Sequence, residues 1–201
     1  LFTFLYSLLF TSKENKKYLI NIGLLFTVFS DISLVLIRPM NQSTGMTTFL
    51  ITQICYFLYL YFNTDNSKSK NIHLITRITL NLLTIIITII VLKKKTDYLS
   101  IISMLYYINL IINVIVAFTK TKKSILLPLG LLLFLCCDTL IGIREAAGVY
   151  LNISETSLLY KMAYSSFNFP WVFYIPSQVI ITLSLTENHK IHKHYSIFFC
   201  S

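Results

Sequence analysis

Charged residues are scarce in this sequence: they make up 12% of its 201 residues, whereas 55% are hydrophobic, and the mean hydropathy is +0.70. This composition excludes an ordinary soluble domain and is typical of a helical protein that crosses a membrane several times. Basic residues outnumber acidic ones by 17 to 8, and nearly all the lysines lie in short gaps between long apolar runs. We therefore interpret the net charge of +9 as membrane-flanking loops beside anionic lipid, and we expect no nucleic-acid partner.

Cysteine is also sparse, and without any C-x-x-C pair its spacing matches neither a disulfide framework nor a zinc site. Three cysteines lie within apolar segments and the fourth lies near the end of the chain: Cys55, Cys136, Cys137 and Cys200. Three histidines gather in the tail, but no carboxylate or thiol frames them: His189, His192 and His194. We therefore expect no metal site.

Long apolar runs make up most of the sequence, and they predict an all-α, polytopic transmembrane bundle of about seven helices. The runs cover residues 1–10, 18–37, 45–62, 72–92, 98–118, 125–143 and 170–185, and a short helix is expected within 155–164. The first run is too short to cross about 30 Å of hydrocarbon, and the sequence does not begin with Met. We expect a single domain over residues 1–201 whose N-terminal helix is incomplete.

One pattern occurs twice, at an offset of 107 residues. Gly23 starts a Gly-Leu-Leu sequence that ends eight residues later at Asp31, and Gly130 starts another that ends at Asp138. A carboxylate within a membrane span is costly and must be neutral, paired or turned toward a wet cavity. We predict that the two aspartates share a polar site; the alternative for each is a structural hydrogen bond or a helix-end position. The repeat predicts two halves, about 1–92 and 98–201.

Loop charges predict the orientation of the chain. Lysine and arginine are more frequent in the loops after the first, third and fifth runs, and in the tail, than in the other loops, which places the first set in the cytoplasm. Both aspartate-bearing spans then run outward, so the halves are parallel repeats. The spans that follow them run inward, so Gln53 and Gln178 lie at a depth similar to that of the two aspartates. Tyr56 and Tyr174 lie on the same helix faces as these glutamines. The predicted site contains Asp31, Asp138, Gln53, Tyr56, Tyr174 and Gln178.

Two further segments lie outside this site. The run 72–92 is rich in Ile and Leu, and we interpret it as lipid-facing. Asn109 and Asn113, four residues apart, are expected to lie on one helix face and to form hydrogen bonds between helices.

Four short motifs follow one another along the chain: Gly-Leu-Leu-Phe before Asp31; Gly45-x-x-x-Phe49-Leu50-x-x-Gln53-x-x-Tyr56; Gly-Leu-Leu-Leu-Phe before Asp138; and Trp171-x-Phe173-Tyr174-x-Pro176-Ser177-Gln178. Together they resemble the YhhN-like lysoplasmalogenase family, small multi-pass membrane proteins of bacteria and animals with about eight helices. The resemblance covers most of the chain and implies a family helix upstream of Leu1.

This resemblance implies hydrolysis of the vinyl ether bond of lysoplasmalogens, which releases a fatty aldehyde and a glycerophospho-ethanolamine or -choline. By matching position, it implies an acidic pair of Asp31 and Asp138, with Tyr174 and Gln178 beside them. The sequence departs from the family pattern at one position: many members carry a histidine where this chain has Gln53. Glutamine does not exchange a proton near neutral pH. The implied partners are a lysophospholipid and the bilayer.

Two buried aspartates suit this chemistry, because its slow step needs a carboxylic acid that is still protonated near neutral pH. Burial in a low-dielectric bundle favours the neutral form of a carboxyl group, and a second carboxylate nearby adds to the effect. One aspartate would act as general acid and the other as stabiliser or base; the sequence does not say which. Neither a metal nor an organic cofactor is required.

Two other functions fit the same features. Parallel repeats with carboxylates in the membrane are also typical of a small-molecule or proton-coupled transporter, and Gln53 favours a catalytically divergent member of the family. Arg38 and Arg144 end the two aspartate-bearing spans and are candidates to hold a phosphate, although helix-end anchoring explains them as well. The Ile-, Asn- and Lys-rich composition suits an AT-rich bacterial genome, so we expect a multi-pass protein of a bacterial cell membrane.

Overall fold

A computed structural model describes residues 1–10, 16–37, 41–64, 67–93, 96–120, 125–146, 156–165 and 167–186. Within these ranges every regular element is helical, which confirms the predicted all-α bundle. The helices are α1 (Phe2–Phe10), α2 (Tyr18–Asp31), the π-helix η2 (Ile32–Leu36), α3 (Gln42–Phe62), α4 (Ser67–Leu92), α5 (Tyr98–Lys120), α6 (Leu126–Ala146), α7 (Leu158–Ala163) and α8 (Phe169–Ser184). Arg38, Cys200 and the tail histidines lie outside the described residues.

Five helical segments of the described chain are long and apolar enough to cross a membrane, which supports an integral membrane protein. They are Tyr18–Leu36, Gln42–Phe62, Ser67–Leu92, Tyr98–Thr119 and Leu126–Glu145. Helix α8 is apolar but shorter, with 16 residues, or about 24 Å of helix. The six-residue α7 lies within the range in which the sequence predicts a short helix.

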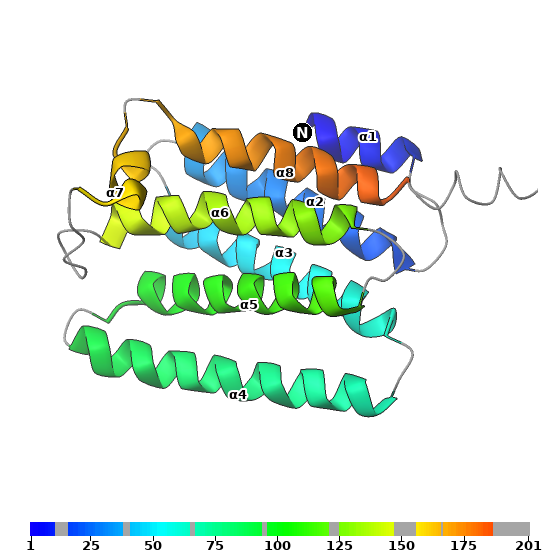
Figure 1. The fold of residues 1–201 in the computed structure, drawn as a ribbon, viewed down its shortest axis with the longest axis horizontal. Coiled ribbons are helices and arrows are strands. Elements are labelled where there is room, and N and C mark those ends of the chain that lie inside the picture. The colour runs from blue at the N-terminus through cyan, green and yellow to red at the C-terminus, as the bar shows by residue number, and fades with distance from the viewer. Residues whose placement is uncertain are drawn as a thin grey trace, which may run out of the picture.

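The long helices alternate in direction along the bundle (Figure 1). Helices α2, α4 and α6 begin at one end, and α3, α5 and α8 begin at the other end, where α7 lies. We call the second of these the α7 end. Because α2 and α6 run the same way, the two predicted aspartate-bearing spans are parallel, and both aspartates lie in the half of the bundle nearer the α7 end.

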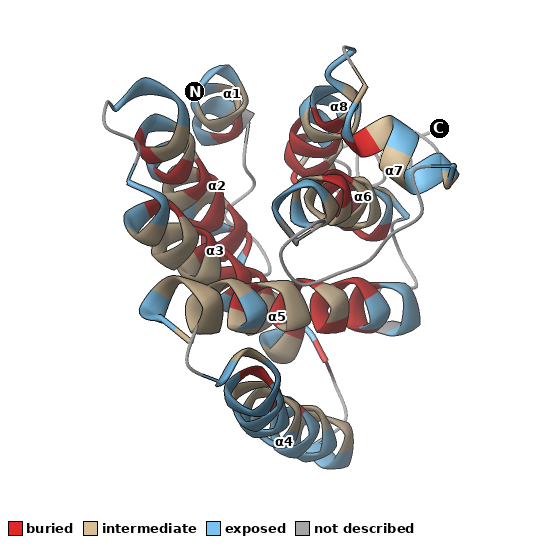
Figure 2. Cartoon of the chain, turned by 90° about the vertical axis from the view of Figure 1, so that its left-hand side faces the viewer, coloured by how far each residue is buried: buried red, intermediate tan, exposed pale blue. Residues whose placement is uncertain are grey.

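Two helix pairs form the body of the bundle, and α5 joins them (Figure 2). Helix α2 packs on α3, and α6 packs on α8; α5 then contacts both α3 and α6. Helix α4 contacts α5 from the outside, and most of its side chains are exposed, as expected for a lipid-facing helix. The site described below therefore lies where the two pairs and α5 meet.

Glycines at equivalent positions of the repeated pattern let each pair pack closely. A Cβ atom on Gly23 would lie 2.5 Å from the buried ring of Tyr56 on α3. A Cβ atom on Gly130 would lie 2.6 Å from Cγ1 of Ile181 and 3.0 Å from its backbone nitrogen, on α8. Only a residue without a side chain fits at these crossings, so the glycines fix how α3 and α8 sit beside the aspartate-bearing helices.

The run 72–92 differs from its prediction at two buried residues, Thr88 and Arg77. Arg77 on α4 is only 6% exposed, and its side chain is turned toward α3 and α5. A buried arginine is not part of a featureless lipid-facing helix, and it marks a second polar cluster in the bundle.

Candidate functional site

Asp31 and Tyr174 meet across the bundle, although 143 residues separate them in the chain. The Tyr174 hydroxyl donates to Oδ1 and Oδ2 of Asp31, at 2.6 and 2.7 Å. Asp31 is the last residue of α2, and Tyr174 lies in the second turn of α8. This contact joins the first half of the chain to the second.

The backbone changes just after Asp31. The helix continues as the π-helix η2, in which the N–H of Ile37 donates to the carbonyl oxygen of Ile32 at 3.0 Å. Such wide turns are rare and are often found at functional sites. Ser30, which is fully buried, donates from its hydroxyl to the carbonyl oxygen of Gly45 at 2.6 Å and so ties this turn to α3. The position of the Asp31 carboxyl group is therefore held by the backbone as well as by Tyr174.

Asp138 forms the second acid–tyrosine pair. The Tyr106 hydroxyl on α5 donates a short hydrogen bond to Oδ2 of Asp138 on α6. Tyr106 is 3% exposed, whereas both aspartates are half-buried. Oδ1 of Asp138 has no hydrogen-bond partner in the part of the chain that the structure describes. Asp138 thus keeps one oxygen for a substrate or a water molecule.

A continuous row of aromatic rings connects the two pairs. From Tyr106 it passes through Phe49 and Phe134 to Tyr174, with successive ring centroids 5.5, 5.7 and 5.7 Å apart. Trp171 continues the row beyond Tyr174, at 5.6 Å. The row therefore connects the two acid–tyrosine pairs through packed side chains.

Tyr56 and Gln178 lie beside this site without touching the aspartates. Tyr56 is 1% exposed and packs against Gly23, and its hydroxyl has no hydrogen-bond partner among the described residues. Gln178 lies one turn beyond Tyr174 on α8, where its Nε2 makes a long contact of 3.4 Å with the Ser177 hydroxyl. Buried hydroxyl side chains lie near both: Thr52 donates to the carbonyl oxygen of Gly23, and Ser177 precedes Gln178.

Gln53, which the sequence places at the depth of the aspartates, makes its side-chain hydrogen bond to another helix. It is fully buried, and its Oε1 accepts a hydrogen bond of 2.9 Å from Asn113 on α5. Asn113 in turn accepts a hydrogen bond of 2.6 Å from Arg77. Depth alone does not fix the direction of a side chain, and on α3 Gln53 faces α5, whereas Tyr56 faces α2. The structure thus separates Gln53 from the acid pairs.

Three residues with a part in these clusters were not predicted from the sequence. Tyr106 bonds to Asp138, Phe49 belongs to the aromatic row, and Arg77 bonds to the asparagines of α5. Tyr106, Asn109 and Asn113 have helical spacing on α5, which was the available signal that Tyr106 faces inward. The interhelical hydrogen bonds predicted for the two asparagines are confirmed: Asn109 also donates to Asn81 on α4 at 2.8 Å.

A carboxyl group that is hydrogen-bonded to a tyrosine hydroxyl inside an apolar bundle can hold and transfer a proton. The model of the YhhN family matches residues 1–185 of the chain. No curated protein and no solved structure matches it.

Proposed function

Because the chain belongs to the YhhN family, we propose that it is a membrane-embedded hydrolase that cleaves the vinyl ether bond of lysoplasmalogens. Its products would be a fatty aldehyde and a glycerophospho-ethanolamine or -choline. The observation that carries the proposal is the pair of acid–tyrosine contacts, Asp31 with Tyr174 and Asp138 with Tyr106. One carboxyl group would deliver the proton for acid-catalysed cleavage, and the other would stabilise the cation.

The reaction needs one proton and one water molecule. A carboxylic acid protonates the carbon atom beta to the ether oxygen. The π electrons of the C=C bond form the new C–H bond, and the carbon atom bonded to oxygen becomes part of an oxocarbenium ion. Water then attacks the oxocarbenium carbon and gives up a proton, which restores the acid. The resulting hemiacetal breaks its C–O bond, leaving an alcohol and an aldehyde. A carboxylate beside the cation stabilises it, as paired carboxylates do at other oxocarbenium centres.

The hydrogen bonds suggest which aspartate takes which role. Both oxygens of Asp31 accept from Tyr174, an arrangement that suits a carboxylate which stays ionised. Only Oδ2 of Asp138 is engaged, by Tyr106, so Oδ1 is available to deliver a proton. We assign Asp138 as the general acid and Asp31 as the group that stabilises the cation and orients water. Tyr106 and Tyr174 are positioning residues for the two carboxyl groups.

The substrate is a lysophospholipid that enters sideways from the bilayer. Exposed apolar side chains flank both members of the Asp31–Tyr174 pair. They are Phe29 on α2, Ile32 on η2, and Val172 and Ile175 on α8. These side chains face hydrocarbon in a membrane and suit the alkenyl chain of the lipid. Tyr56 and Gln178 would line the inner part of this path, and a substrate contact for Gln53 stays a prediction.

The parallel repeat and the location are also proposals. The halves about 1–92 and 98–201 are supported by the parallel directions of α2 and α6 and by the equivalent packing of Gly23 and Gly130. We place the protein in a bacterial cell membrane, with the α7 end on the outer side, as the loop charges predict.

Running the reaction in D₂O tests the proposal. The full chain in detergent is incubated with a lysoplasmalogen, and the aldehyde is analysed by mass spectrometry. We expect a fatty aldehyde that carries one deuterium at the carbon next to the carbonyl group, because that carbon receives the proton from the acid. Aldehyde without deuterium there would contradict protonation at carbon. No aldehyde from folded protein would contradict the hydrolase and favour the transporter or the divergent family member.

A further inference from the structure

Arg77 is a charged side chain buried in the bundle without a charged partner. It is 6% exposed and lies ten residues after Ser67, the first residue of α4, or about 15 Å along the helix. Arginine stays protonated in proteins, so a full positive charge lies at this depth. No acidic side chain in the described ranges forms an ion pair with it.

The contacts of Arg77 are neutral and leave some of its donors unused. Nη1 donates to Oδ1 of Asn109 and Nη2 donates to Oδ1 of Asn113, both at 2.6 Å. The guanidinium carbon lies 4.1 Å from the ring centroid of Phe57. Nε is buried and has no hydrogen-bond partner among the described residues. These contacts fix the orientation of the guanidinium group but do not neutralise it, and an unpartnered buried donor needs an acceptor.

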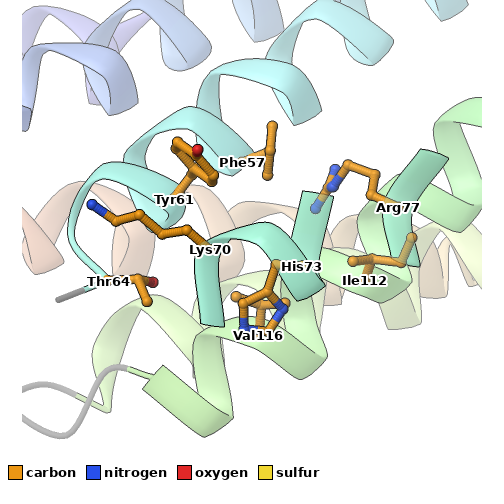
Figure 3. Close-up of a pocket in the computed structure, with 8 residues that line it drawn as sticks. All are labelled: Phe57, Tyr61, Thr64, Lys70, His73, Arg77, Ile112 and Val116. Atoms are coloured by element: carbon orange, nitrogen blue, oxygen red, sulfur yellow. The ribbon is translucent and has the colours of Figure 1, made fainter. Parts of the chain in front are cut away.

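Arg77 lines a pocket between α3, α4 and α5 that also contains two other basic side chains (Figure 3). Lys70, His73 and Arg77 lie on one face of α4, at helical spacing. Figure 3 shows Phe57 and Tyr61 on the α3 side, with the guanidinium group of Arg77 turned toward Phe57. No aspartate or glutamate lines this pocket, so its electrostatic character is positive.

We propose that this pocket binds a phosphate group, carried by a lipid head group or by a small soluble phosphate compound. A phosphate has several acceptor oxygens and more than one negative charge near neutral pH, which suits a pocket lined by Arg77 and Lys70, whose Nζ lies 5.7 Å from the ring centroid of Tyr61. The pocket lies toward the end of the bundle opposite α7, where α4 begins, whereas the acid pairs lie toward the α7 end. The inference does not rest on the proposed reaction.

Binding to the full chain in non-ionic detergent tests the site, with two probes in separate titrations: inorganic phosphate and didecanoyl phosphatidic acid. We expect saturable binding, detected as a rise of the melting temperature and as a dissociation constant from calorimetry. Binding of the lipid alone identifies a head group as the source of the phosphate. Comparable binding of inorganic phosphate identifies a soluble compound. No saturable binding of either probe would overturn the proposal.

Matched variants locate the binding. Lys70→Gln removes a charge from the pocket, and Lys68→Gln removes the same charge two positions away, outside the pocket lining. We expect Lys70→Gln to weaken binding about tenfold or more, the value of one charge-assisted hydrogen bond, and Lys68→Gln to change it less than about twofold. Arg77→Gln should abolish binding if circular dichroism shows an intact fold. Equal binding by the Lys70 and Lys68 variants would overturn the proposal, even if the Arg77 variant fails to fold.

Discussion

The Tyr174 hydroxyl on α8 donates to both carboxylate oxygens of Asp31 on α2, which brings together residues 143 positions apart in the chain. The same two helices are tied at the opposite end, where Nζ of the buried Lys17 donates to the carbonyl oxygen of Leu185 at 2.6 Å. Because α2 and α8 are linked near both ends, the Asp31–Tyr174 contact belongs to a fixed crossing of the two helices.

Tyr106 is expected to matter for turnover because its hydroxyl holds Asp138. Tyr106→Phe removes a hydrogen bond to a carboxyl group without changing the ring, and we expect turnover to fall about ten- to a hundredfold. The matched control is Tyr107→Phe, because Tyr107 pairs with the Thr139 hydroxyl at 2.8 Å and not with an acid. Aldehyde release from both variants measures the effect. Equal loss in both would show that Tyr106 has no specific role in positioning Asp138.

Gly130→Ala is expected to destabilise the bundle. The new Cβ would lie 2.6 Å from the side chain of Ile181 and 3.0 Å from its backbone nitrogen, so α8 must shift. Overpacking of this kind costs about 1 to 3 kcal/mol. Gly142→Ala on the same helix is the control, since no atom lies within 4 Å of its Cβ position; there alanine should be neutral or stabilising by up to about 1 kcal/mol. Thermal unfolding in detergent compares them, and similar melting temperatures would contradict the close packing of α6 on α8.

Asp97 gives a pH-dependent contribution to stability at the start of α5. Hydrogen bonds from the hydroxyl and the backbone N–H of Ser100, at 2.5 and 2.8 Å, hold the pKa of Asp97 below its ordinary value. A carboxyl group whose pKa is lower in the folded state stabilises the fold above its unfolded pKa, about 3.9, and loses this effect as the pH falls through the folded pKa. Asp97→Ala should therefore lower the melting temperature at neutral pH and lower it less in acid. A difference that does not depend on pH would contradict this contribution.

The sequence predicted the helices well because their signal is local. The run 98–118 became α5 (Tyr98–Lys120), and the run 125–143 became α6 (Leu126–Ala146), since about 20 apolar residues in sequence leave few alternatives to a spanning helix. The pairing of Asp31 with Tyr174 in one site was also predictable, from motif and depth. The π-helix after Asp31 was not, because a wide turn leaves no mark in the apolar pattern.

The surroundings of Gln53 and Arg77 could not be predicted, because the depth of a residue does not give the direction of its side chain. Gln53 has a depth that permits a contact with the aspartates, yet on α3 it faces α5 and bonds to Asn113. Arg77 is the only charged residue between Ile72 and Leu92, and the run around it is rich in Ile, Leu and Thr, which favours a lipid-facing helix. Its burial depends on the asparagines of α5, which lie more than 30 residues away in the chain. Only tertiary packing brings these groups together.

The most direct test of the account is aldehyde release from a lysoplasmalogen by the full chain in detergent, compared with Asp31→Asn and Asp138→Asn. We expect turnover to fall about 10²- to 10⁴-fold in Asp138→Asn, because the amide cannot deliver the proton, and to fall strongly in Asp31→Asn, because the cation loses its stabilising charge. Asp97→Asn is the control, since Asp97 is exposed and lies outside the site; its turnover should stay near that of the native chain. Unchanged turnover in both site variants, with active native protein, would contradict catalysis by the paired aspartates.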